Sequence, residues 1–216
     1  MASIGPNELF FLMQGLKWTL ALTIIGFIGG GIFGLCVALA RVADRPAVQR
    51  ASAAFIAVFQ GTPLLMQLFV VYYGVALAGL NVDAWIAVAI AFTLHASAFL
   101  GEIWRGGIQA VPKGQTEAAN ALGLHYVSRM KDVVLPQAFK ISLPATIGFL
   151  VQLIKGTSLA AIVGFVELSR AGQIVSNQTF RPLTVFAIVG IIYFLICWPL
   201  SLWGAGVEKR LQAASR

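Results

Sequence analysis

Four polar side chains stand inside or beside long apolar stretches of this 216-residue sequence, where a charge is costly and often functional. Lys155 interrupts one such stretch, and the hydroxyls of Thr157 and Ser158 follow it. Glu167 lies 12 residues after Lys155, about 18 Å along a helix, so one straight helix cannot pair the two charges. These residue types could line a pathway for a polar solute, with Glu167 attracting a cationic group. Snorkelling or a structural partner for Lys155, and an interfacial position for Glu167, are the alternatives.

His95 and Glu102 are seven residues apart, which places them on one face of a helix. Such a pair is typical of a proton relay in a membrane, and also of a satisfied polar face near a helix end. We favour the polar face. An intramembrane hydrolase that combines His95 with Ser97 or Ser158 has no support, because no nucleophile motif surrounds either serine.

The usual sequence motifs for nucleotide and metal chemistry are missing. G-K-[ST] occurs nowhere, and the segment that begins at Lys155, K-G-T-S, has the wrong order for a phosphate-binding loop. H-E-x-x-H and C-x-x-C are also absent. We therefore expect no cofactor, no metal ligand and no catalytic residue in this chain.

The composition indicates a membrane protein. Hydrophobic residues make up 59% of the chain and charged residues only 11%, whereas a soluble domain has about 25% charged residues. The mean hydropathy is +0.86. A chain of this kind would aggregate in water, which excludes a soluble enzyme, a disordered tail and a secreted disulfide scaffold. In such a chain the net charge of +7 is typical of cytoplasmic loops rather than of nucleic-acid binding.

Five apolar stretches are each long enough, or nearly so, for a membrane-spanning helix of about 20 residues. The second, Ala51–Val82, contains Gly61-Thr62-Pro63, which indicates an unwound or tilted portion. If the N-terminus is outside, the inside loops hold eleven Lys and Arg residues and the outside regions hold three. The sequence therefore predicts an all-α membrane protein, one domain over 1–216, with the N-terminus outside and the C-terminus cytoplasmic. Its spans lie at about 14–40, 53–78, 84–105, 141–166 and 183–207.

Glycines recur at every fourth position of the first span. Gly26, Gly30 and Gly34 form small-xxx-small pairs, which permit close contact between helices. This pattern predicts a packing function for the stripe rather than a part in transport.

The longest connection, at about 106–140, is predicted to be a cytoplasmic helix-turn-helix. Gln115–Leu122 is rich in alanine and favours a helix, and Gly123 follows as the residue type that ends helices in the left-handed conformation. A second short helix is expected at about Tyr126–Val134, with Pro136 and Pro144 bracketing the return to the next span. The small side chains of the first helix would let another protein approach its backbone closely.

This connection resembles the EAA loop of the membrane subunits of bacterial ABC importers. The family pattern is E-A-A-x3-G-x9-I-x-L-P, and the sequence departs from it only by Val in place of Ile. The resemblance implies a loop that docks on an ATPase subunit. The matching residues are Glu117, Ala118, Ala119, Gly123, Val133, Leu135 and Pro136.

Three further segments resemble the polar amino acid uptake branch of the same family. G-T-P-L-L, which begins at Gly61, resembles the R-G-T-P-L-L segment of that branch, with Gln60 where the branch often has Arg. E-I-x-R-G-G-I begins at Glu102, and K-G-T-S-L, followed by E-L at Glu167, begins at Lys155. Together the similar segments extend over about residues 15 to 210.

The resemblance implies a type I ABC importer transmembrane domain, the permease subunit for a polar amino acid in a bacterial cytoplasmic membrane. It also implies three partners: a pair of ATPase subunits that bind ATP and Mg²⁺, a periplasmic or lipid-anchored solute-binding protein, and a second permease subunit, identical or paralogous. The amino acid itself is left open. The candidate residues of the substrate pathway are Gly61, Thr62, Pro63, Gln67, Lys155, Thr157, Ser158 and Glu167.

The alternative hypothesis is a proton-coupled secondary transporter that works through His95, Glu102 and Lys155. It predicts uptake that collapses with an uncoupler while ATP persists. Five spans make it awkward, because inverted repeats need equal halves.

Overall fold

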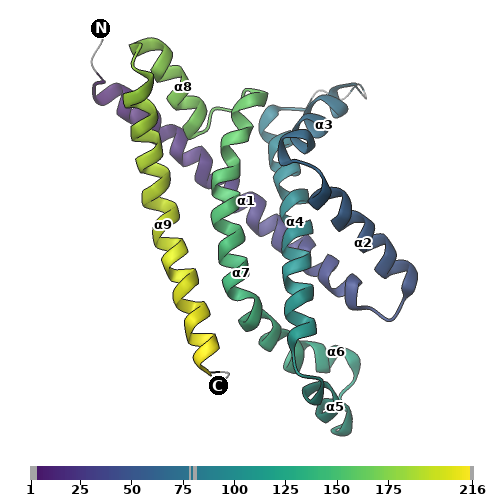
Figure 1. The fold of residues 1–216 in the computed structure, drawn as a ribbon. Coiled ribbons are helices and arrows are strands. Elements are labelled where there is room, and N and C mark those ends of the chain that lie inside the picture. Colours follow the sequence, from purple (N-terminus) through teal and green to yellow (C-terminus); the bar gives the residue numbers. More distant parts are fainter. Residues whose placement is uncertain (1–3, 78, 80–81, 215–216) are drawn as a thin grey trace.

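The computed structural model describes residues 4–77, 79 and 82–214, and every regular element in that part of the chain is helical. The long helices run roughly upright, and α1 crosses them diagonally (Figure 1). In chain order the elements are α1 (Pro6–Val42), α2 (Pro46–Gly61), α3 (Leu64–Leu77), α4 (Ala84–Ala110), α5 (Lys113–Ala121), α6 (Tyr126–Ser128), the π-helical segment η1 (Arg129–Val134), α7 (Leu135–Gly156), the 3-10 segment η2 (Thr157–Val163), α8 (Leu168–Thr179) and α9 (Pro182–Ala214).

Residues with a known preference for helix starts begin several of these helices. Pro6, Pro46 and Pro182 occupy the first position of α1, α2 and α9, where the missing N–H has no helical partner in any case. Asp83 precedes α4, and its carboxylate accepts a hydrogen bond of 2.8 Å from the backbone N–H of Trp85. The helix boundaries therefore follow from local chemistry.

The glycine stripe of α1 lies directly against α4. A Cβ atom on Gly30 would be 2.3 Å from the Cβ of Ala96, and one on Gly26 would be 3.0 Å from the Cβ of Phe92. Only glycine allows the two backbones to approach so closely. The predicted packing function of the stripe is confirmed.

The main apolar core surrounds α4, which contacts α1, α2, α3 and α7. A second cluster joins α1, α8 and α9 near the start of α1, where α8 lies in Figure 1. The side chains buried in the main core include Leu22, Leu68, Val88, Phe92, Leu100, Phe149, Leu153 and Val163.

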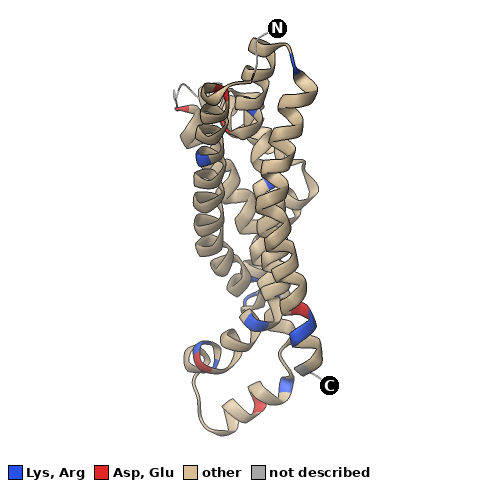
Figure 2. Ribbon diagram, turned by 90° about the vertical axis from the view of Figure 1, so that its left-hand side faces the viewer, with Lys and Arg blue, Asp and Glu red and all other residues tan. Residues whose placement is uncertain are grey.

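Four helical stretches are long and apolar enough to cross a membrane: α1, α4, the run Tyr126–Val163, and α9. The pair α2 and α3 also qualifies, although it is bent by 104°, so the described residues hold up to five spans if the pair is counted once. Between its two ends the ribbon carries almost no charged residues (Figure 2). The predicted second span ends at residue 78, which lies outside the described residues.

Different helices lie at the two ends of the molecule. α1 begins at one end, whereas α5, α6 and the last turns of α9 lie at the opposite end (Figure 1). This arrangement places the predicted cytoplasmic loop at the same end of the molecule as the C-terminal part of α9, which agrees with the topology predicted from Lys and Arg.

The fourth span departs from the prediction of one helix over 141–166. The α-helix ends at Gly156, a 3-10 segment follows, and Gly164 has a φ of +85°. The premise of one straight helix from Lys155 to Glu167 is therefore wrong, because the α-helix ends at Gly156 and the chain changes direction at Gly164. A further helix, α8, follows Glu167 and was not predicted.

The second half of the predicted cytoplasmic loop also departs from the prediction of one short helix at about Tyr126–Val134. Only Tyr126–Ser128 is α-helical, and the chain continues through η1 into α7 without a gap. Pro136 lies in the first turn of α7 and Pro144 lies inside it, so the two prolines do not bracket the helix start as predicted. Pro136 is tolerated there because the first turn of a helix needs no N–H donor.

Candidate coupling loop and transport pathway

The first half of the loop is a short helix closed by a left-handed glycine. The backbone N–H of Gly123 donates to the carbonyl of Asn120 at 2.9 Å, and that of Leu124 donates to the carbonyl of Ala119 at 3.0 Å. Gly123 has a φ of +72°, which a residue with a side chain adopts only with strain. The prediction that Gly123 ends the helix in this conformation is confirmed.

The second half of the loop anchors it to the membrane helices. Met130 and Val134 of η1 are buried with Val111 and Ala138, and Ile108 near the end of α4 packs against them. The amide of Gln137 caps the π-helical turn by donating to the carbonyl of Val133 at 2.7 Å. The loop is thus fixed to the ends of α4 and α7. Leu135 and Pro136 begin α7 itself.

The other face of the loop carries exposed apolar side chains. Leu122 is 80% exposed and Val127 is 71% exposed, although both are large and apolar. Glu117 and Ala118 are exposed as well, whereas Ala119 is buried against the rest of the loop. An open groove of about 540 Å³ runs beside α5 and is lined in part by Glu117. An apolar surface with a small-residue helix is suited to contact with another protein.

The break in the second span lies at Thr62 and Pro63, as the sequence predicted. Thr62 donates its hydroxyl to the carbonyl of Val58 at 2.7 Å. Gln67, in the first turns of α3, is buried, and its amide nitrogen donates to the carbonyls of Phe59 at 2.7 Å and Thr62 at 3.0 Å. Gly61 has open space around it. The side chain of Gln67 is therefore hydrogen-bonded to the backbone at the break, and its direct contact with substrate stays a prediction.

Lys155 lies at the point where two open grooves meet. One groove, of about 720 Å³, runs between α7 and α9, and the other, of about 310 Å³, is lined by Ser158 and Tyr193. Lys155 is exposed, and among the described residues no carboxylate lies within 4.0 Å of it. The hydroxyls of Thr157 and Ser158 donate to the carbonyls of Ile154 and Lys155, so they complete the transition from α7 to η2.

Glu167 is fully buried and joins α1, α8 and α9 at the end of the molecule where α1 begins. Its carboxylate caps α8 by accepting from the backbone N–H groups of Ser169 and Arg170, each at 2.8 Å. It also accepts from the hydroxyls of Tyr193 at 3.0 Å and Thr19 at 3.3 Å. Burial raises the pKa of Glu167, against the lowering effect of these donors. The geometry gives Glu167 a structural position in this conformation rather than one that faces a cavity.

Replacing Glu167 with glutamine is expected to destabilise the packing of α8 on α1 and α9 by about 2 kcal/mol or more. An amide in place of the carboxylate leaves buried donors without acceptors, each at about 1–3 kcal/mol. Thermal unfolding and hydrogen exchange of α8 measure this loss. Asp83→Asn, at an exposed cap, is the control and should cost little. Unchanged stability with a weaker affinity for cationic substrates would instead support the predicted contact with substrate.

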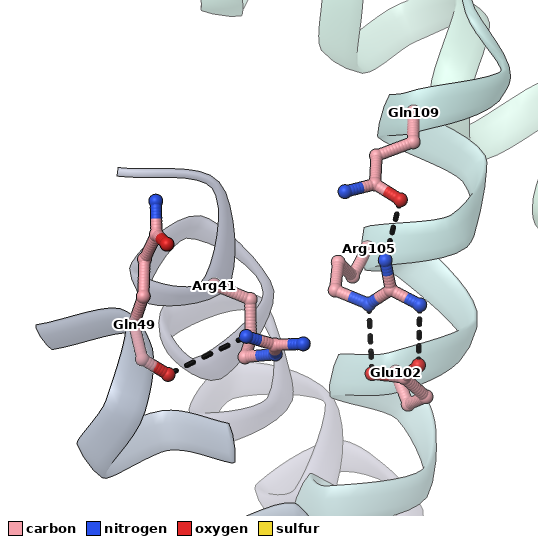
Figure 3. A network of polar contacts seen from close by, with 5 residues as sticks. All are labelled: Arg41, Gln49, Glu102, Arg105 and Gln109. Carbon is pink, nitrogen blue, oxygen red and sulfur yellow. Dashed lines mark hydrogen bonds and ion pairs between the residues drawn. The ribbon is translucent and has the colours of Figure 1, made fainter. Parts of the chain in front are cut away.

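Glu102 and Arg105 form an ion pair in the C-terminal part of α4 (Figure 3). Arg105 also donates to Gln109, and Arg41 from α1 lies across from the pair and donates to the carbonyl of Gln49. Glu102 is thus bonded within its own helix. The polar face that we favoured over a proton relay agrees with this pairing.

These features define a helical membrane protein with a compact loop that is anchored on α4 and α7, at the end opposite the start of α1. Residues 30–213 match the protein family described as "Binding-protein-dependent transport system inner membrane component". The chain belongs to this family.

Relatives and solved structures of known class agree with the assignment. The chain is 36% identical over 205 residues to the arginine transport system permease protein ArtQ of Bacillus subtilis, covering 94% of this chain and 93% of that protein. It is 36% identical over 202 residues to the L-cystine transport system permease protein TcyB of the same organism, covering 93% and 86%. A crystal structure of an amino acid ABC transporter with histidines matches with a TM-score of 0.86 at 33% identity, covering 94% of this chain and 95% of that chain.

Proposed function

We propose that this chain is the permease subunit of an ABC importer that carries a polar amino acid inward across the bacterial cytoplasmic membrane. The observation that carries the proposal is the loop. Its E-A-A-x3-G pattern coincides with a short helix that a left-handed glycine closes and that buried side chains anchor on α4 and α7. The family and the amino acid permeases among the relatives support the same function.

The topology that we propose has five spans, the N-terminus outside and the loop in the cytoplasm. Two ATPase subunits dock on the loops of two permease subunits, and they bind the ATP and Mg²⁺. A solute-binding protein delivers the amino acid to the outer face. The permease chain itself holds no cofactor and hydrolyses nothing. The location of the loop and the end of α9 on the same side supports this arrangement (Figure 1).

The loop acts as a short lever in this mechanism. ATP binding draws the two ATPase subunits together, and each docked loop moves with its ATPase subunit. Because η1 continues into α7 without a break, movement of the loop turns α7 directly. The pathway then alternates between outward-open and inward-open states. The burial of Met130 and Val134 supports a rigid link, since a loosely attached loop would absorb the movement.

The pathway that we propose runs past the break at Gly61, Thr62 and Pro63 and past Lys155 and Ser158. Non-helical backbone at membrane depth is tolerated where protein buries it or where it lines a water-filled cavity. The open space at Gly61 and the exposure of Lys155 support contact with the solute. The remaining candidates, Gln67, Thr157 and Glu167, are buried, so we assign them to the walls of the pathway in this conformation.

The proton-coupled alternative has less support. A relay needs titratable groups within reach of one another, but the hydrogen bonds of the three candidate groups go elsewhere. His95 is bonded to Gln67, Glu102 is bonded to Arg105, and no carboxylate lies within 4.0 Å of Lys155 among the described residues. The family assignment also favours an importer driven by ATP.

Affinity purification from native membranes tests the proposed assembly. We expect an ATPase subunit and a solute-binding protein to co-purify with the chain, and the binding protein can then be screened against free amino acids. Uptake should persist with a protonophore as long as ATP is supplied. Collapse of uptake with the protonophore at a constant ATP level would support the proton-coupled transporter instead.

A further inference from the structure

The break between α2 and α3 creates an unusual demand for hydrogen bonds. The last four carbonyls of a helix have no partner within it, and an apolar membrane offers no water to replace one. Pro63 has no N–H, so it cannot serve the carbonyl that precedes it by one turn. Two features must therefore be explained: what satisfies these carbonyls, and what holds the second span at a bend of 104°.

Gln67 supplies the missing donors. Its amide nitrogen reaches the carbonyl of Phe59 on α2, and it reaches both the carbonyl and the hydroxyl oxygen of Thr62 at the break, the last at 3.0 Å. Because Gln67 itself belongs to α3, the side chain ties the two halves of the span together. A glutamine in this otherwise apolar segment is thereby accounted for.

His95 fixes the orientation of the Gln67 amide. The amide nitrogen of Gln67 donates to the carbonyls at the break, so its amide oxygen is left as an acceptor. The Nδ1 of His95 lies 3.0 Å from this oxygen. This requires the proton of the imidazole to be on Nδ1. The ring is held in turn by Phe99 and Phe149, whose centroids lie 4.5 Å and 6.2 Å from it.

The break lies against the second irregular element of the fold. A Cβ atom on Gly156, where α7 gives way to η2, would be 3.2 Å from Leu64 in the first turn of α3. α3 also packs against η2. The position of α3 therefore determines what the end of α7 meets when α7 moves.

We propose that Gln67 and His95 are positioning residues for transport: they hold the second span bent, so that α3 stays against the end of α7. This inference rests on the proposed transport function and deepens it. Without the two side chains, the bonds that hold α2 to α3 at the bend are lost, and the carbonyl of Thr62 finds a backbone donor, the N–H of Met66, only in a straighter span, so α3 leaves η2. Movement of α7 then no longer closes the pathway around the solute, and ATP is hydrolysed with little uptake.

Three variants separate positioning from other roles of the same residues. Gln67→Met keeps the approximate size and removes every hydrogen bond. His95→Phe keeps the aromatic ring beside Phe99 and removes the donor. His95→Asn keeps an N–H donor near the position of Nδ1 and removes the ring. Each is prepared in the full complex with the ATPase subunit and the solute-binding protein, reconstituted in liposomes.

The first readout is the amount of solute moved per ATP hydrolysed. We expect Gln67→Met and His95→Phe to lower this ratio at least tenfold, and the double variant to be no worse than either single one. His95→Asn should stay within about twofold of the unaltered protein. Equal loss in His95→Phe and His95→Asn would overturn the proposal, because it would assign the function to the imidazole itself. Unchanged ratios in all three variants would overturn it too.

The second readout is the shape of the span. Spin labels at Ala47 and Leu77, both exposed, would be about 45 Å apart on one straight helix and roughly 25 Å apart at a bend of 104°. The background lacks Cys36 and Cys197, and labelled permease is diluted with unlabelled permease. We expect His95→Phe to lengthen or broaden the distance and His95→Asn to preserve it. A native distance in His95→Phe would contradict the proposal. If instead the unaltered complex shows no ATP-driven uptake, the proposed function fails, while the distances still test whether Gln67 and His95 hold the second span bent.

Discussion

Replacing Gly123 with valine is expected to lower ATP-driven uptake about tenfold while the membrane helices remain folded. A β-branched residue at a φ of +72° is strained by at least about 1–2 kcal/mol, and 1.4 kcal/mol corresponds to a tenfold change in a population. The strain favours other shapes of the turn, so fewer loops keep the shape that docks. No neighbouring atom lies within 4 Å of the position, so strain rather than collision is tested. Uptake and ATP hydrolysis are measured together in liposomes.

Two matched variants control for this result. Gly114→Ala lies in the same short helix, has open space around it and has no left-handed φ, so it should leave uptake unchanged. Gly123→Asn should retain most of the uptake, because asparagine tolerates the left-handed conformation. Equal uptake in the valine and asparagine variants would show that the turn does not transmit the movement.

Replacing Gly30 with alanine is expected to destabilise the whole bundle by about 1–3 kcal/mol, the usual result of overpacking a close contact. The new methyl group would lie 2.3 Å from the Cβ of Ala96 and 3.0 Å from its backbone carbonyl carbon. Neither atom is at the end of a flexible side chain, so α1 and α4 must move apart. A lower midpoint of thermal unfolding in detergent measures the effect.

The adjacent glycine provides the control. A Cβ atom on Gly31 would lie 3.4 Å from the far end of the Trp104 ring, which is an ordinary contact. Gly31→Ala should therefore leave the midpoint almost unchanged. Adding Ala96→Gly to the Gly30→Ala variant should restore part of the loss, because it removes the atom with the closest contact. A midpoint that does not distinguish Gly30→Ala from Gly31→Ala would refute the proposed packing of α1 on α4.

Features set by local chemistry could be predicted from the sequence. The left-handed turn at Gly123 and the break at Thr62 and Pro63 follow from what glycine and proline do to the adjacent backbone, whatever surrounds them. The glycine stripe of α1 was also predicted, because a repeat of four residues defines one face of a helix. The helix that packs against this stripe, α4, was not predicted, since contacts between residues far apart in the sequence determine it.

Features that depend on distant contacts could not be predicted. Glu167 was assigned to the substrate pathway, yet its bonds to Thr19 and Tyr193 connect residues that are 148 and 26 positions away. The hydrogen bond between Gln67 and His95 spans 28 positions, and neither residue alone indicates the other. A signal for α8 existed: an acidic residue at 167 followed by an amphipathic stretch is typical of a capped helix start. It was hidden between two apolar spans.

The central claim is that this chain has no energy source of its own and is driven from the cytoplasmic side through the loop. The most direct test places the purified permease in liposomes, with and without its ATPase subunit and solute-binding protein, and measures uptake of a labelled amino acid with MgATP on the side of the loop. The account predicts accumulation only in the complete complex, and none with an ATP analogue that resists hydrolysis. Accumulation by the permease alone under an imposed proton gradient would contradict it.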